Sequence, residues 1–134
     1  MSISLILASS SATRRRLLKN AGVDFRVVPP GLDEKTIKTE YQTQGANPSE
    51  TALALALAKA RTVSSKFPDQ LVLGADQILV CNGQWFEKPK GTDGVRNHLN
   101  QLSGQQHKLI NGVAIVECGI PVWCYDNTIT MKMR

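Results

Sequence analysis

A short apolar segment, residues 3–8, runs directly into consecutive serines, and a predicted helix with a pair of arginines follows. The first backbone amides of a helix lack intrahelical partners and attract anions, and serine hydroxyls nearby can bind the same anion. Arg14 and Arg15 would lie in the first turn, where positive charge opposes the helix dipole. A bound phosphate would remove that conflict, because arginine offers paired donors to phosphate oxygens. Ser9, Ser11, Arg14 and Arg15 are therefore candidate phosphate ligands; the alternative is an ordinary serine cap with surface arginines.

Three acidic residues, Asp33, Glu34 and Asp76, are candidates for a second kind of chemistry. Asp76 lies between two apolar, strand-like segments, residues 71–73 and 78–81, where an ionised carboxylate is unfavourable unless it is paired or binds a metal. Magnesium and manganese prefer oxygen ligands. Carboxylates that face phosphate-binding basic residues therefore suit a divalent cation, Mg²⁺ or Mn²⁺. The alternatives are a turn cap for Asp76 and a solvated loop for Asp33 and Glu34.

Two lysines could add positive charge to such a site: Lys59 inside an alanine-rich segment and Lys88 before a proline. Lysine at such places is more often a surface residue. His98 and His107 lack partners at metal-site or triad spacing, so both are interpreted as structural or surface residues, although His107 could reach a cleft. The chain contains no nucleophile elbow, P-loop or GxGxxG motif.

The elements that must position these residues alternate along the chain. Helix caps and turn signals predict helices over residues 12–21, 48–65 and 92–102, and leave residues 31–46 as a polar stretch. Apolar runs predict strands over residues 3–8, 25–28, 71–73, 78–81, 84–86, 109–116 and 122–133, with a break at 74–76 and a hairpin at Asn82-Gly83. The pattern predicts one α/β domain, residues 1–134, with a mixed, curved central sheet flanked by helices and two lobes around a cleft.

Composition limits the classes of partner. A net charge of +5 favours anionic partners such as nucleotide phosphates, nucleic acid or a membrane surface. Aromatic residues make up only 5% of the chain and do not alternate with basic ones, which argues against a nucleic-acid-binding module. No apolar run approaches the roughly 20 residues of a membrane span. An odd number of unpaired cysteines suits a reducing compartment, so we expect a soluble cytoplasmic protein.

Taken together, six short stretches resemble the Maf family, also described as septum-formation inhibitor proteins. They are Leu7-Ala8-Ser9-Ser10-Ser11-Ala12-Thr13-Arg14-Arg15-Arg16-Leu17-Leu18, Asp33-Glu34, Ala58-Lys59-Ala60, Gly74-Ala75-Asp76-Gln77, Lys88-Pro89, and Leu102-Ser103-Gly104 with His107 before Gly112-Val113-Ala114. Each is weakly specific alone, but their order and spacing resemble the family's from residue 5 to residue 134. Ala12 stands where the family commonly has proline. Family members also continue past the strand that ends at Arg134, so the resemblance implies a missing C-terminal segment with a site glutamine.

The resemblance implies an inosine-triphosphate-pyrophosphatase-like fold, a homodimer, and hydrolysis of a nucleoside triphosphate between its α and β phosphates. Arg14, Arg15, Lys59 and Lys88 would then neutralise the triphosphate, and Ser9 and Ser11 would orient its oxygens. Glu34 and Asp76 would hold the metal, and Asp76 would accept the proton of the attacking water. The alternative is a nucleotide-binding or regulatory protein that has lost catalysis together with the C-terminal segment.

Gln77 bears on the choice of base. Maf proteins that act on unmethylated pyrimidine nucleotides tend to have threonine after the motif aspartate, and glutamine there is similar to the branch associated with 7-methyl-GTP. An amide offers both a donor and an acceptor to a base or sugar edge, whereas threonine offers a shorter hydroxyl. The resemblance therefore favours a methylated or otherwise modified nucleotide and makes Gln77 a candidate substrate-binding residue.

Overall fold

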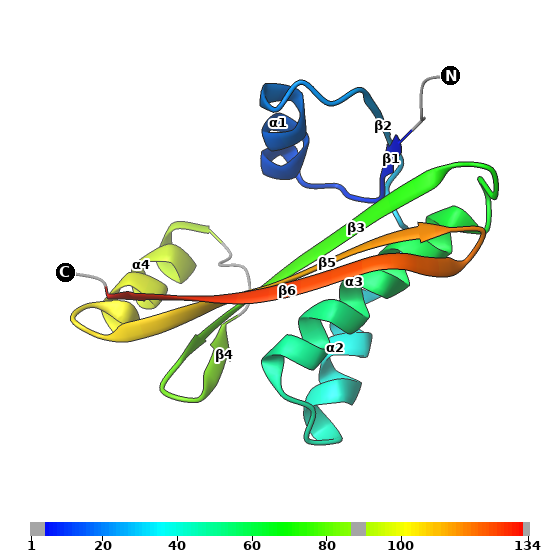
Figure 1. The fold of residues 1–134 in the computed structure, drawn as a ribbon. Helices are drawn as coiled ribbons and strands as arrows, with labels where there is room; N and C mark the ends of the chain where they lie inside the picture. The colour runs from blue at the N-terminus through cyan, green and yellow to red at the C-terminus, as the bar shows by residue number, and fades with distance from the viewer. Residues whose placement is uncertain (1–4, 87–90, 133–134) are drawn as a thin grey trace.

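One mixed six-stranded sheet organises the chain, and helices lie around it (Figure 1). The computed structural model describes residues 5–86 and 91–132. The strands are β1 (Leu5–Leu7), β2 (Phe25–Val27), β3 (Leu71–Cys81), β4 (Gln84–Phe86), β5 (Gln106–Glu117) and β6 (Ile120–Lys132). The helices are α1 (Ala12–Asn20), α2 (Glu34–Thr43), α3 (Pro48–Ser64) and α4 (Gly91–Leu102). The strand order is β2-β1-β3-β5-β6, with β4 also paired to β3, so the predicted mixed α/β architecture is confirmed.

Helices α1 and α3 begin where their predicted caps indicated, whereas α4 begins at Gly91, so the predicted cap Thr92 lies inside that helix. Ser11 Oγ accepts a hydrogen bond from the amide of Arg14 at the start of α1. At the start of α3, Asn47 Oδ1 accepts from the amide of Glu50 at 2.8 Å, and Asn47 Nδ2 donates to the Glu50 carboxylate at 3.0 Å. The first of these bonds satisfies a backbone amide that the helix itself leaves without a partner, and the second holds the two side chains together. None of the helices in the described residues is both long and apolar enough to cross a membrane.

Several elements differ from the sequence prediction. The polar stretch over residues 31–46 contains α2, whose first turn is capped by the Asp33 carboxylate accepting from the amide and hydroxyl of Thr36. The predicted break at residues 74–76 is wrong, because β3 continues through it and pairs antiparallel with β5. Glycine and aspartate are poor strand formers, but the cross-strand ladder overrides that local preference. The last two strands also extend beyond the ranges predicted for them.

Helix α3 packs unusually close to the sheet, over β3 and β5. Gly74 on β3 lies against the backbone of Ala56, and Gly112 on β5 lies against the backbone of Ala52. Apolar side chains fill the rest of this layer, and the largest cluster comprises Ile6, Ala8, Ala60, Val63, Val72 and Val116. The two glycines therefore set how near α3 approaches the strands, and with it how far the side chains of α3 reach.

Gly74→Ala is expected to lower the free energy of unfolding by about 2–3 kcal/mol, as overpacking of a core does. An added Cβ would lie 2.1 Å from the carbonyl oxygen of Ala56, so the helix or the strand would have to move. Urea unfolding followed by circular dichroism measures the change. The matched control is Ala75→Val, on the neighbouring residue and the opposite face, which should change stability by less than about 1 kcal/mol. Equal losses in the two variants would contradict the close-packing explanation.

Strand β3 has an interrupted edge. β1 pairs with residues 71–73 of β3, and β4 pairs with residues 79–81 on the same edge, while β5 occupies the opposite edge from Leu71 to Val80. Among the described residues, the middle of β3, residues 74–78, therefore has a strand neighbour only on the β5 side. Loops and side chains can reach the sheet there, which makes this gap the natural place for a site.

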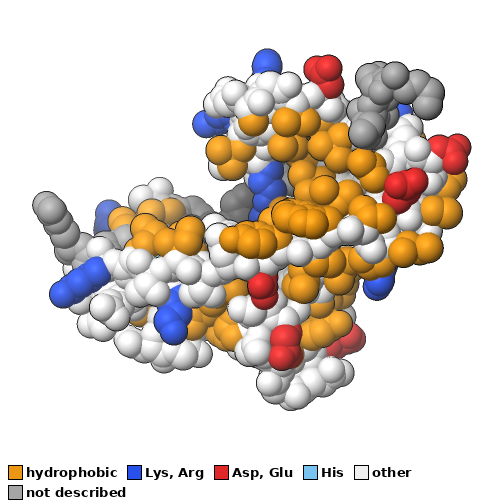
Figure 2. Space-filling view, viewed as in Figure 1, with side chains coloured by type: hydrophobic (Ala, Val, Ile, Leu, Met, Phe, Trp, Pro, Cys, Tyr) orange, Lys and Arg blue, Asp and Glu red, His pale blue; other side chains and the backbone are white. Residues whose placement is uncertain are grey.

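The face of the sheet opposite α3 is largely apolar and open. On β6, the outermost strand, Trp123 and Tyr125 stack with their ring centroids 5.9 Å apart, and each is about half exposed. Ile129 and Met131 lie further along β6 on the same face and are also about half exposed. Figure 2 shows orange, hydrophobic side chains gathered along the front of the molecule, where β6 runs in Figure 1. The described chain thus leaves one apolar sheet face in contact with solvent.

Candidate functional site

A cleft of about 740 Å³ lies at the interrupted edge of β3. It is lined by the turn before α1 and its first residues, by the first turns of α2, by α3, by the middle of β3 and by the end of β4. The lining residues are Ser9, Ser10, Ser11, Ala12, Thr13, Arg14, Pro30, Glu34, Lys35, Lys38, Leu55, Lys59, Asp76, Gln77 and Phe86. In Figure 2 the molecule is hollowed between the part that carries α1 and the part that carries α4. The predicted cleft is thus present, and segments far apart in sequence meet in it.

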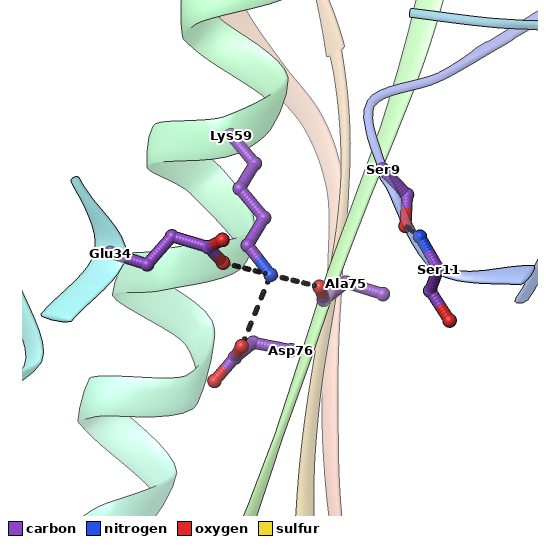
Figure 3. A network of polar contacts seen from close by, with 6 residues as sticks. All are labelled: Ser9, Ser11, Glu34, Lys59, Ala75 and Asp76. Atoms are coloured by element: carbon purple, nitrogen blue, oxygen red, sulfur yellow. Dashed lines mark hydrogen bonds and ion pairs between the residues drawn. The ribbon is translucent and has the colours of Figure 1, made fainter. Parts of the chain in front are cut away.

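Lys59 is the centre of the polar contacts in the cleft (Figure 3). Its side chain is almost fully buried, and its Nζ lies 3.1 Å from Asp76 Oδ1, 2.5 Å from Glu34 Oε1 and 3.0 Å from the carbonyl oxygen of Ala75. An ammonium group has three donors, so these three acceptors use all of them. Lys59 therefore holds two carboxylates close together, that of Glu34 at the start of α2 and that of Asp76 on β3.

Asp76 has an unusual protonation equilibrium. Burial, which disfavours the charged form, raises the pKa of Asp76 even though the nearby Lys59 ammonium and Arg14 guanidinium lower it. The carboxylate is thus more basic than an ordinary aspartate, which suits a group that accepts a proton. Asp33 differs in this respect, since its hydrogen bonds from Thr36 hold the pKa of that carboxyl below its usual range.

Because the pKa of Asp76 is raised, replacing this residue with asparagine is expected to increase the stability of the protein. A carboxyl whose pKa is higher in the folded than in the unfolded state makes folding less favourable once it ionises. Without added metal, Asp76→Asn is therefore expected to unfold at higher urea concentration than wild type at pH 7. The difference should shrink as the pH falls through the raised pKa of Asp76, and vanish near the usual carboxyl value of 3.8. A difference that does not change with pH would contradict this assignment.

The opposite wall of the cleft is built to bind an anion. Ser9 is buried, and its Oγ accepts a hydrogen bond from the amide of Ser11 at 2.9 Å. Ser11 Oγ in turn accepts from the amide of Arg14 at 3.3 Å. Because both oxygens accept from the backbone, each hydroxyl hydrogen is left to donate to a ligand. Arg14 lines the cleft beside these hydroxyls, so donors and positive charge converge at the start of α1.

The other predicted site residues divide between the cleft and its surroundings. Gln77 lines the cleft and donates from Nε2 to Asn111 Oδ1 at 2.9 Å. Arg15 is exposed and is not a lining residue. Lys88 lies outside the described residues. His107 is buried and does not line the cleft, in keeping with a structural role.

Sequence reasoning missed two cations in the cleft, Lys35 and Lys38, which come from α2. Their spacing from Glu34 places all three residues within the first turn and a half of one helix. The available signal was the Asp33 cap with Thr36 three residues later, which marks a helix start. Because that helix was not predicted, the two lysines could not be assigned to the site.

Glu34 and Asp76 are the residues that could hold a metal ion. Both carboxylates approach the same nitrogen, and both present hard oxygen donors to the cleft. No group of three or more metal-binding side chains of histidine, cysteine, aspartate or glutamate occurs in residues 5–86 and 91–132. Two carboxylates together with substrate phosphates and water are a typical set of ligands for Mg²⁺. The residues present therefore fit a cation that binds with the substrate better than a closed structural metal site.

Known proteins share both the sequence pattern and the fold. The chain is 39% identical over 130 residues to the nucleoside triphosphate pyrophosphatase of Granulibacter bethesdensis, an alignment that covers 97% of this chain and 66% of the relative. It is 44% identical over 134 residues to the 7-methyl-GTP pyrophosphatase of Rhizobium johnstonii, covering 100% of this chain and 67% of the relative. This chain thus spans about two thirds of the length of these relatives.

Solved structures confirm the predicted fold. The Ham1 protein of Staphylococcus aureus superposes with a TM-score of 0.60 at 14% identity, over 96% of this chain and 71% of that protein. The likeness at this identity concerns the fold alone. The sequence match is more specific, because the Maf-like protein family matches from residue 4 to residue 134 and so includes every motif described above. The chain belongs to the Maf-like protein family.

Proposed function

We propose that the chain is a hydrolase that converts a nucleoside triphosphate to the nucleoside monophosphate and pyrophosphate. Relatives at about 40% identity are named nucleoside triphosphate pyrophosphatase and 7-methyl-GTP pyrophosphatase, which supports this reaction class. The observation that carries the proposal is the arrangement of the cleft. Lys59 gathers two carboxylates on one wall, and the serine-rich start of α1 with Arg14 forms an anion site on the other.

The residues divide the reaction between binding and proton transfer. Ser9, Ser11 and Arg14 bind the phosphate oxygens and neutralise the charge that develops on the leaving pyrophosphate. Water attacks the α-phosphorus, the bond from that phosphorus to the oxygen bridging to the β-phosphorus breaks, and Asp76 accepts the proton of the water. Lys59 orients Asp76 for this step and compensates its charge. A divalent cation at Glu34 and Asp76 would polarise the phosphate and lower the pKa of the attacking water.

Arg15 and Lys88 are proposed to add positive charge that neutralises the triphosphate. Arg15 is exposed near the start of α1, from where a long side chain could reach the outer phosphates of a bound triphosphate. Lys88 follows β4, whose last residue, Phe86, lines the cleft. We also propose that the cation is Mg²⁺ or Mn²⁺. A cytoplasmic location is proposed as well, and the three free cysteines support it.

The substrate class and the assembly are also proposals. Gln77 lines the cleft one residue after Asp76, where an amide can contact a base, and this supports a modified purine such as 7-methyl-GTP. A homodimer is supported by the exposed apolar face that includes Trp123 and Tyr125, since exposed patches of this kind commonly mark contact surfaces. Light scattering on the purified chain would measure its mass in solution directly.

Product analysis tests the proposed reaction. The chain is incubated with Mg²⁺ or Mn²⁺ and a panel of canonical and methylated triphosphates, and the products are separated by ion-exchange chromatography. We expect monophosphate and pyrophosphate in equal amounts, and no product after the metal is removed with EDTA. Diphosphate and inorganic phosphate would show cleavage at the other anhydride bond and contradict the proposal. Triphosphate binding without any product would favour the nucleotide-binding alternative.

A further inference from the structure

Three amide side chains form one row across the open face of the sheet. Gln77 on β3, Asn111 on β5 and Asn127 on β6 are direct register partners. Gln77 Nε2 donates to Asn111 Oδ1 at 2.9 Å, and Asn111 Nδ2 donates to Asn127 Oδ1 at 3.0 Å. The row begins in the cleft, where Gln77 is a lining residue, and ends on the outermost strand. It therefore connects the candidate site to β6 through two hydrogen bonds.

The amide row lies between apolar rows on the same face of the sheet. The adjacent rows on the same face are apolar: Ala75, Val113 and Tyr125 on one side, and Leu79, Leu109 and Ile129 on the other. Packing of this face alone would favour apolar residues in the middle row as well. Amides at three successive register positions could pin the register of the strands, or they could serve the one amide that reaches the cleft. The second explanation also accounts for the start of the row at a residue that lines the cleft.

In the structure the two hydrogen bonds run in the same direction, from Gln77 to Asn111 and from Asn111 to Asn127. With Nε2 held by Asn111, the carbonyl oxygen Oε1 and one remaining N–H are left for a ligand. In the proposed reaction the anion site binds the phosphates and Asp76 accepts the proton of the attacking water, which leaves the adjacent Gln77, on the other face of β3, for the nucleoside end. A carbonyl oxygen there repels a ring nitrogen that carries a lone pair and attracts a cationic ring.

We propose that Asn111 and Asn127 are positioning residues that hold the Gln77 carbonyl oxygen toward the base and thereby favour an N7-methylated, cationic purine over an unmethylated one. Unmethylated guanine presents N7 as an acceptor, which a fixed carbonyl oxygen opposes. Methylation removes that lone pair and gives the ring a positive charge. This inference rests on the proposed function for its ligand class, and its test measures binding without turnover.

The test compares equilibrium binding of the α,β-methylene analogues of 7-methyl-GTP and GTP, which resist cleavage, by isothermal titration calorimetry on the full chain. Wild type is expected to prefer the methylated analogue. Asn111→Leu, which frees the amide of Gln77, should reduce the ratio of the two affinities about tenfold, the effect of roughly one hydrogen bond. Asn111→Asp should keep the preference, because its carboxylate still accepts from Gln77. Asn127→Leu, on the exposed outermost strand, should reduce the ratio by less.

Thr128→Leu is the matched control, since it changes the next residue of β6, which pairs with Ile110 outside the amide row, and it should leave the ratio unchanged. If Asn111→Leu and Asn127→Leu are folded and keep the wild-type ratio, the row only pins strand register and the inference is wrong. A wild type that binds both analogues equally would also overturn it. Failure of the proposed hydrolysis has a different signature: a preference for the methylated analogue with no pyrophosphate released from either true triphosphate.

Discussion

Asp76→Asn is expected to reduce pyrophosphate release roughly 100- to 10,000-fold, the range found when a general base is removed. The amide keeps the shape of the side chain and can still contact Lys59, but it cannot accept the proton of the attacking water or contribute a charged oxygen to a cation. Initial rates with saturating Mg²⁺ and substrate measure the effect on kcat. The stability of this variant at pH 7 without added metal should be above that of wild type, because burial already disfavours the ionised carboxylate.

That combination of lost activity and retained stability separates a chemical role from a structural one. If Asp76→Asn loses activity only because it unfolds, its urea midpoint will fall together with the rate. If it keeps more than about one tenth of the wild-type kcat, Asp76 is not the proton acceptor. Asp33→Asn is a suitable companion variant, since Asn can cap α2 as Asp33 does and Asp33 does not line the cleft.

Lys59→Met is expected to destabilise the protein by about 3 kcal/mol at pH 7, because removing one member of a buried ion pair leaves the other without compensation. Lys59 is 5% exposed, and its ammonium is the cation that contacts both Asp76 and Glu34. Without it, the pKa of Asp76 rises further, so the destabilisation should diminish as the pH falls and Asp76 becomes protonated. Urea unfolding at pH 7 and pH 5 measures both effects.

A double-mutant cycle sharpens the test of the Lys59–Asp76 pair. Lys59→Met combined with Asp76→Asn removes both charges, and its stability should recover toward that of wild type. Lys66→Met, at an exposed lysine just beyond α3, controls for the general effect of replacing a lysine. A double variant whose stability equals the sum of the two single effects would show that Lys59 and Asp76 do not interact energetically, contrary to their 3.1 Å separation.

Local signals in the sequence predicted much of the fold. Ser11 and Asn47 accept amide hydrogen bonds as helix caps, and Gly22 follows α1 in a left-handed conformation with φ of 76°. Such features act within a few residues, so they can be identified from sequence alone. The hairpin at Asn82-Gly83 is equally local, since both residues adopt the positive φ that this tight turn requires.

What the sequence could not predict depends on tertiary packing. Helix α2 has no buried residue, so it lacks a strong apolar periodicity, and only its cap indicated a helix. The continuity of β3 through Gly74 follows from the close approach of α3, a contact between residues 18 positions apart, Ala56 and Gly74. The same approach determines that Lys59 lies between two carboxylates. The members of the site were therefore predictable by type, whereas their mutual contacts were not.

The central claim is that Glu34, Lys59 and Asp76 form the hydrolytic centre of a nucleoside triphosphate pyrophosphatase. Its most direct test is the pyrophosphate release rate of Glu34→Gln beside that of its sequence neighbour Asp33→Asn, with wild type as reference. Glu34 contacts Lys59 in the cleft, whereas Asp33 only caps α2. The account predicts a rate near wild type for Asp33→Asn and a loss of roughly 100-fold for Glu34→Gln, as expected when a ligand or charge of the reacting centre is removed. Equal rates for the two variants would contradict it.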